Sequence, residues 1–243
     1  LENKITNKTK WIILNSPSNP TGAFYTEMEL QNLAKILLKH PHVWIMCDDL
    51  YEHIIFDNLK FKNILQVDNK LRSRTFVVNG VSKAYAMTGW RVGYGAGPKE
   101  LIKEISKIQS QSTTHTSSIS QAAAIEALDN SEEFIKKNKK IFQERRDLIY
   151  SKLKDFPLLQ VFLPQGSFYT YICCNDIIGK KKEDGTEITN DLDLSDYLLD
   201  EGVAVVPGEA FGCTNFLRIS FATSNENIIE GCDKIISACK KLK

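Results

Sequence analysis

The chain has 243 residues, of which 42% are hydrophobic and 25% charged, a globular composition with room for one large domain or two smaller ones. Lysine plus arginine (31) nearly balances aspartate plus glutamate (30), so the charge favours neither a nucleic-acid partner nor an anionic membrane surface. No apolar stretch approaches the ~20 residues that span a bilayer, and neither the cysteines nor the histidines have metal-ligand spacing. Most cysteines lie in apolar segments, where a free thiol packs as a small hydrophobic side chain, which indicates a reduced, cytoplasmic chain.

The first half of the chain alternates short apolar, β-rich segments with helical patterns. This alternation predicts an α/β fold with a largely parallel, doubly wound sheet. We expect strands at 11–15, 43–48, 75–79 and 91–96. A helix begins at the capping box Thr26–Glu29, between the first two strands. A second helix runs from about residue 99 to residue 109.

Two more helices are predicted at 117–129 and 131–155. The second would be about 37 Å long, and we interpret it as a connection between two domains. Beyond it, the pattern changes to a compact α+β unit. Its expected strands are 159–163, 168–174, 203–206 and 216–221, and its expected helices lie near 192–201 and 225–241. The sequence therefore predicts domains at 1–130 and 156–243, joined by the helix 131–155.

Polar side chains lie at or shortly after the ends of three of the predicted strands. These are Asn19, in the turn Asn19-Pro20-Thr21-Gly22, then Asp48 with Tyr51, and then Ser82 with Lys83 and Arg91. Taken singly, each has an ordinary explanation as a turn residue, a helix cap or a surface charge. Taken together, they lie at the carboxyl ends of consecutive strands, where open α/β sheets bind ligands.

This set of side chains suits one kind of cofactor. Pyridoxal 5′-phosphate needs a lysine for a Schiff base, an acid at its ring nitrogen, donors at its ring oxygen and a cation on its phosphate. The residues at the strand ends supply these groups: an amide, a carboxylate and a phenol, and a lysine and an arginine. Together they suit a flat, anionic molecule that contains nitrogen.

The same segments resemble the class I, fold-type I aminotransferases of the aspartate aminotransferase family. The segment 82–94, with the sequence S-K-A-Y-A-M-T-G-W-R-V-G-Y, is most similar to the bacterial branch that includes aspartate/prephenate aminotransferases. Further similar segments are 120–123, 164–169, 206–212 and 217–220. The resemblance covers essentially the whole chain, in the order and spacing of the family.

The resemblance implies catalytic roles for Lys83, Asp48 and Tyr51. Lys83 would form the Schiff base with the cofactor and carry the proton between the substrate and the cofactor. Asp48 would pair with the ring nitrogen, and Asn19 and Tyr51 would hydrogen-bond the ring oxygen.

The resemblance also implies ligands for the two anionic groups. Ser82 and Arg91 would bind the cofactor phosphate. Arg218, with Asn19, would bind the α-carboxylate of the substrate, because a planar guanidinium can hold a carboxylate with two parallel hydrogen bonds. Gly80 departs from family members that place a phosphate-binding serine there, which implies one hydrogen bond fewer.

For the domains, the resemblance implies that 1–130 is the C-terminal part of a large cofactor-binding domain, 131–155 an interdomain helix and 156–243 the small domain. Family chains have about 400 residues, so we expect about 150 residues to precede Leu1 in the whole protein. Those residues would carry further phosphate ligands and a specificity lysine. We therefore expect a chain that is poorly active alone and a parent that is a cytoplasmic homodimer.

The expected reaction moves the amino group of aspartate or glutamate to a 2-oxo acid. Two alternatives stay open from the sequence. One is another fold-type I enzyme, such as an aromatic or kynurenine aminotransferase or a carbon–sulfur lyase. The other is a non-catalytic regulatory domain that binds the cofactor.

Overall fold

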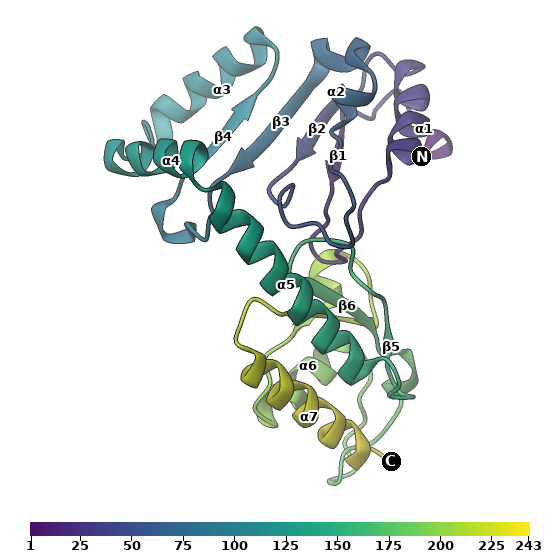
Figure 1. Cartoon of the computed structure of the whole chain (residues 1–243). Coiled ribbons are helices and arrows are strands. Elements are labelled where there is room, and N and C mark those ends of the chain that lie inside the picture. The colour runs from purple at the N-terminus through teal and green to yellow at the C-terminus, as the bar shows by residue number, and fades with distance from the viewer. The chain divides into compact units, whose positions relative to one another are not determined.

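The computed structural model describes all residues, Leu1–Lys243, and forms two compact units (Figure 1). The first unit comprises Leu1–Pro17 and Phe24–Asn138, and the second comprises Ser18–Ala23 and Lys139–Lys243. The division falls inside helix α5 (Glu132–Leu153), which contributes residues to both. No helix combines the length and the apolar character needed to cross a membrane.

The first unit contains a four-stranded sheet in the order β1-β2-β3-β4. Its strands are β1 (Trp11–Asn15), β2 (Trp44–Asp48), β3 (Thr75–Gly80) and β4 (Gly93–Ala96). The first three run parallel and β4 runs antiparallel to β3, so the sheet is mostly parallel as predicted. Strand β4 begins two residues later than expected because Arg91 has a left-handed backbone (φ 55°), which an extended strand cannot contain.

Four α-helices lie wholly in the first unit: α1 (Glu27–Leu38), α2 (Ile64–Val67), α3 (Lys99–Ser112) and α4 (Ser118–Asn130). The predicted capping box starts α1, with the Thr26 hydroxyl accepting from the Glu29 amide and the Glu29 carboxylate accepting from the Thr26 amide. Helix α2 was not predicted, because a four-residue helix shows no apolar periodicity. Short 3₁₀ turns span Glu2–Lys4, Asn69–Arg74 and Thr88–Trp90.

The core of the first unit joins α1 and α2 to β1 and β2. Its fully buried members include Leu37, Val43, Ile45 and Leu71, each at 0% exposure. Burying a side chain of this size stabilises the fold by about 1.5–3 kcal/mol. This core holds the carboxyl ends of β1, β2 and β3 in register, which places the segments that follow them at one edge of the sheet.

The second unit contains an antiparallel sheet in the order β5-β6-β8-β7. Its strands are β5 (Gln160–Val161), β6 (Tyr169–Cys173), β7 (Val206–Pro207) and β8 (Phe216–Ser220), and its helices are α6 (Asp191–Asp200) and α7 (Asn225–Lys241). Two 3₁₀ turns, η4 (Asn175–Ile177) and η5 (Gly208–Phe211), complete it.

Two strands of the second unit differ from their predicted ranges by more than one residue at an end. Strand β5 keeps only two of the five residues expected. Strand β7 starts at Val206 and not at residue 203, because the Val203 amide donates to the Leu198 carbonyl (2.8 Å) and closes the end of α6. Gly202 permits that closure with φ +85°, the conformation that commonly ends a helix.

Candidate functional site

In the first unit, three of the expected site residues gather where β2 and β3 end. Asp48 is the last residue of β2, and Lys83 follows the last residue of β3 by three positions. The Lys83 ammonium lies 6.0 Å from the centre of the Tyr51 ring, and Tyr51 is buried. Burial raises the pKa of Asp48, while the backbone amide of Leu50 and the positive charge of Lys83 act in the opposite direction. The structure therefore brings an amine, a carboxyl and a phenol together at one edge of the sheet.

Ser82 and Arg91 lie on the loop that links β3 to β4, and hydrogen bonds within the loop hold it together. The Thr88 hydroxyl donates to the Ser82 carbonyl (2.9 Å), and Arg91 Nη1 donates to the Thr88 carbonyl (2.8 Å). Gly80, at the end of β3, pairs with Gly93, at the start of β4. Arg91 consequently lies at the same edge of the sheet as Lys83, and its guanidinium is exposed.

The close approach of two backbone strands explains why position 80 is occupied by a glycine. A β-carbon there would lie 2.9 Å from the Val92 carbonyl oxygen and 3.2 Å from the Gly93 α-carbon. Both neighbours are backbone atoms, so a serine would force β3 and β4 apart. No hydroxyl can be offered to an anion from this position.

In the second unit, Arg218 and Asn19 form a separate cluster. Arg218 lies on β8, and its Nη1 donates to the Asn19 side-chain oxygen (2.9 Å). The guanidinium carbon lies 4.5 Å from the centre of the Tyr169 ring and 4.9 Å from that of Phe211. The Arg218 Nε is buried and makes no hydrogen bond within the chain. A guanidinium that contacts two aromatic rings and has a donor still unused suits a bidentate carboxylate.

The turn that carries Asn19 is attached to the second unit through Gly22. The Gly22 carbonyl accepts from the amides of Gln165 (2.9 Å) and Gly166 (3.0 Å). Gly22 has φ +67°, and a β-carbon there would lie 2.5 Å from Pro164 Cβ. The glycine of the N-P-T-G motif thus permits both the turn and its close packing on the segment 164–166.

Several supporting side chains were not singled out from the sequence. Tyr169 and Phe211 fall inside the similar segments, but nothing local marks them as flanking Arg218. Asn15, on β1, donates from its amide nitrogen to the Asp48 carbonyl (3.2 Å). The buried Asp49 accepts from Asn63 Nδ2 (2.5 Å), and burial raises its pKa to about 7. A polar residue at the end of a parallel strand was the one signal that could have identified Asn15 and Asp49.

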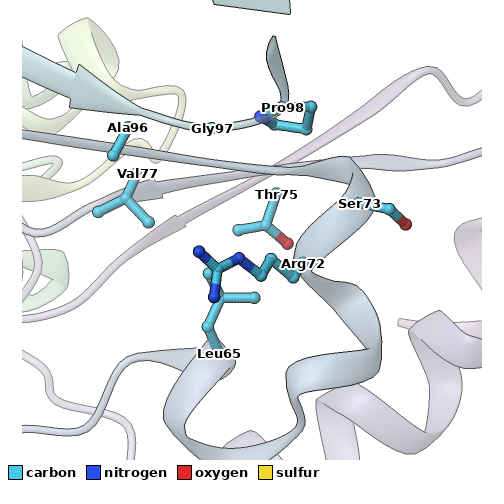
Figure 2. Close-up of a pocket in the computed structure, with 8 residues that line it drawn as sticks. All are labelled: Leu65, Arg72, Ser73, Thr75, Val77, Ala96, Gly97 and Pro98. Atoms are coloured by element: carbon cyan, nitrogen blue, oxygen red, sulfur yellow. The ribbon is translucent and has the colours of Figure 1, made fainter.

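Two cavities of the first unit differ in chemistry. Figure 2 shows one of about 420 Å³ lined by Leu65, Arg72, Ser73, Thr75, Val77, Ala96, Gly97 and Pro98. This cavity includes Thr75, the first residue of β3, so it lies at the end of that strand away from Lys83. No acidic side chain lines it. The other, of about 430 Å³, adjoins Arg91 and is lined by His115 and several hydroxyls without a carboxylate, a lining that suits an anion. No cluster of histidine, cysteine or acidic side chains could hold a metal ion.

Comparison with known proteins adds a family model and close relatives. The model described as "Aminotransferase class I and II" matches residues 1–235. A "Probable aspartate/prephenate aminotransferase" of Rickettsia felis is 53% identical over 240 residues, which are 98% of this chain and 59% of the relative. An "Aspartate aminotransferase" of Rhizobium meliloti is 48% identical, and the match covers 100% of this chain and 59% of the relative.

A solved structure is similar over the whole chain. The crystal structure of an aspartate aminotransferase from Rhizobium meliloti superposes with a TM-score of 0.95 at 48% identity, covering 100% of this chain and 61% of that one. The chain thus spans about three-fifths of the length of the relatives that it matches.

Proposed function

Because this chain belongs to the class I and II aminotransferase family and has the fold-type I architecture, we propose that the whole protein moves the amino group of aspartate or glutamate to a 2-oxo acid, with pyridoxal 5′-phosphate as its cofactor. The observation that carries the proposal is the position of Lys83, with its ammonium beside the Tyr51 ring and its charge acting on Asp48. The names of the relatives favour aspartate as the amino donor.

The donor set of the chain fits the cofactor. Lys83 would bind it covalently, Asp48 would face the ring nitrogen, and Tyr51 with Asn19 would hydrogen-bond the ring oxygen. Ser82 and Arg91 would hold the phosphate, next to the cavity whose lining of hydroxyls and imidazole carries no negative charge. The cofactor supplies an electron-withdrawing ring, which stabilises the negative charge that forms when the amino acid loses its Cα proton.

The side chains of the protein then bind, orient and move a proton. Arg218 would hold the α-carboxylate through its fork of donors, with Asn19 fixing one of its nitrogens. Fixing the carboxylate orients the Cα–H bond, and such orientation accounts for a large part of enzymatic acceleration. Lys83 would accept the Cα proton on Nζ and return it elsewhere, as a general base and acid.

The domain assignment is supported by the presence of two compact units that divide within α5, although Ser18–Ala23 groups with the second unit. We assign 1–130 to the C-terminal part of the large cofactor-binding domain, 131–155 to the interdomain helix and 156–243 to the small domain. All six cysteines are free and five are buried, which suits a reducing compartment such as the cytoplasm. We expect a homodimer from the family resemblance.

The first test is to find the lysine that binds the cofactor. Whole protein titrated with pyridoxal phosphate should develop a saturable imine absorption band, and borohydride reduction followed by peptide mapping should place the label on Lys83. Lys83→Arg, which keeps the charge but not the reactive amine, should lose the band and at least about 100-fold of the transamination rate. Lys103→Arg, on the exposed face of α3, is the matched control. A label on other lysines would contradict the assignment.

A substrate panel separates the proposed reaction from its alternatives. Aspartate and glutamate should be better donors than aromatic amino acids, and cystathionine should not be cleaved. A preference for aromatic donors, or release of a thiol from cystathionine, would favour another fold-type I enzyme. Cofactor binding without turnover of any amino acid would favour the regulatory domain.

A further inference from the structure

The ring of Phe211 lies on one face of Arg218, and Phe211 belongs to a single 3₁₀ turn, η5. A turn of four residues between two short strands has little intrinsic stability. Contacts from outside η5 must therefore determine where this ring lies.

One such contact comes from a buried carboxylate. Asp191 is 0% exposed, and its Oδ2 accepts from the Glu209 amide in η5 (2.9 Å), 18 residues further along the chain. Its other oxygen is also buried and has no hydrogen-bond partner. Burying a carboxylate costs free energy unless hydrogen bonds compensate. A buried Asp191 with only one hydrogen bond, to η5, therefore needs a structural or functional reason.

Capping of its own helix does not explain Asp191. The N-cap of α6 is Asn190, whose side-chain oxygen accepts from the Asp193 amide (2.9 Å). Asp193 adds a second acid to the same turn and bonds to Thr189 outside the core. The N-cap hydrogen bond of α6 is therefore made without Asp191, whose own hydrogen bond leads to the turn that carries Phe211.

Tyr171 holds the other end of this segment. Burial raises the pKa of Tyr171 to about 12, so its hydroxyl stays protonated and donates to the Cys213 carbonyl (3.4 Å). The Tyr171 ring also meets Phe211 edge-on, with ring centres 6.3 Å apart. Asp191 thus bonds the second residue of η5 and Tyr171 bonds Cys213, two residues after the turn ends, so the two bonded positions lie on either side of Phe211 in the sequence.

We propose that Asp191 is a positioning residue for the substrate-carboxylate site: by accepting from the Glu209 amide it holds η5, and with it the Phe211 ring, against the guanidinium of Arg218. This inference rests on the proposed function, in which Arg218 binds the α-carboxylate. Without Asp191 the ring can leave that face, and the guanidinium loses part of its fixed orientation. Ligands that carry a carboxylate should then bind less well, while the cofactor should bind as before.

The test measures binding of maleate, a dicarboxylate that cannot react, to the whole protein with its cofactor. Asp191→Ala should weaken maleate binding about tenfold, the scale expected for losing one charge-assisted hydrogen bond. Asp191→Asn, which keeps an acceptor oxygen, should restore most of the affinity. The matched control is Asp196→Ala, on the exposed face of α6, which should bind maleate like the wild type. The affinity for pyridoxal phosphate should not change in any of these variants.

Two further measurements exclude a general structural effect. Phe211→Leu should weaken maleate binding, and adding Asp191→Ala to it should cause little further loss, because both changes remove the same ring contact. The half-reaction with ethylamine, which has no carboxylate, should proceed at an unchanged rate. Asp191→Ser, compatible with a first helical turn, replaces the alanine variant if that one does not fold.

The outcomes separate the two proposals. If the wild type binds maleate, Arg218→Ala abolishes that binding and Asp191→Ala behaves like Asp196→Ala, the positioning role is wrong and the proposed function stands. Equal losses with maleate and ethylamine would also overturn the positioning role. If the wild type binds neither cofactor nor maleate, the proposed function itself fails.

Discussion

Asp49 is a buried acid whose charge state changes near neutral pH. It is 6% exposed, and burial raises its pKa to about 7; the bond from Asn63 lowers that pKa, and the charges of Glu52 and Asp48 raise it again. An unfolded aspartate has a pKa of about 3.9. Between these two values the folded chain retains a proton that the unfolded chain loses, so stability falls as the pH rises from about 4 to about 7 and then levels off.

Asp49→Asn should remove this pH dependence. The amide oxygen can still accept from Asn63, so the variant should match the wild type near pH 4, where both states of the wild type hold the proton, and exceed its free energy of unfolding at pH 8. The gap of about three pKa units sets an upper limit of about 4 kcal/mol for the gain. Urea unfolding at both pH values measures the effect, with the exposed Asp129→Asn as control. Parallel pH profiles for the Asp49 variant and the wild type would contradict the prediction.

At the residue scale, the sequence predicted those site residues whose position relative to a neighbouring apolar strand is visible locally. Asp48 ends one apolar strand and Lys83 follows the next, and their convergence depends only on the parallel order of β2 and β3. The bond between Asn19 and Arg218 joins residues 199 positions apart, so only the family resemblance suggested that both belong to one site. The rings that flank Arg218 could not be predicted, because an aromatic residue in a strand or turn is normally part of a core.

The C-terminal end of helix α1 is hydrogen-bonded by a cationic side chain that is distant in sequence. Arg74 Nη2 donates to the Leu37 carbonyl (2.6 Å), and its Nη1 donates to the carbonyls of His40 (3.2 Å) and Val43. A cation at a helix C-terminus satisfies unpaired carbonyls and complements the helix dipole. Arg74 immediately precedes β3, so these bonds also connect the end of α1 to the start of that strand.

Arg74→Met keeps the aliphatic part of the side chain but leaves these carbonyls without their donor. We expect a loss of about 2 kcal/mol in the free energy of unfolding, the scale for unsatisfied, partly buried polar groups. Arg72→Met, in the same 3₁₀ turn but with an exposed side chain, should change it by less than about 0.5 kcal/mol. Urea unfolding compares the two variants, and equal losses would show that the carbonyl bonds of Arg74 contribute nothing specific.

At the element scale, boundaries were predicted well where the signal is local. The Thr26–Glu29 capping box marked the start of α1, and the range 225–241 was correct for α7. Boundaries failed where distant or conformational effects decide them. The apolar residues after Gly202 read as a strand, but the Val203 amide is already used to close α6. Similarly, the apolar pattern around Arg91 cannot reveal its left-handed backbone.

For the whole molecule, the alternation of strands and helices predicted both the mostly parallel sheet and the separate α+β unit. It could not predict that Ser18–Ala23, which begins three residues after the end of β1, would group with the second unit. That grouping depends on Gly22, whose packing on the segment 164–166 joins parts of the chain far apart in sequence. Contacts of this kind arise from tertiary packing and leave no local pattern.

The first unit leaves large apolar surfaces exposed. Helix α3 has no buried residue, and every residue of β4 is exposed. The exposed side chains include Tyr94 (43%), Ile108 (70%), Ile119 (75%) and Ile125 (60%). Strands β1 and β4 are also the edges of their sheet, so their outer hydrogen-bonding groups have no strand partner. Apolar patches and open sheet edges of this kind promote association between chains.

We therefore expect the 243-residue chain to self-associate, with a mass by light scattering that rises above 27.5 kDa as the concentration increases. The double substitution of Ile119 and Ile125 in α4, each by lysine, should reduce this association without loss of stability, because both side chains are already exposed. The matched control replaces Leu192 and Leu199 of α6, which are exposed in the second unit, and should leave the association unchanged. A monomer at every concentration would contradict the prediction, and an equal effect of the control pair would show that the exposed face of α4 is not the surface responsible.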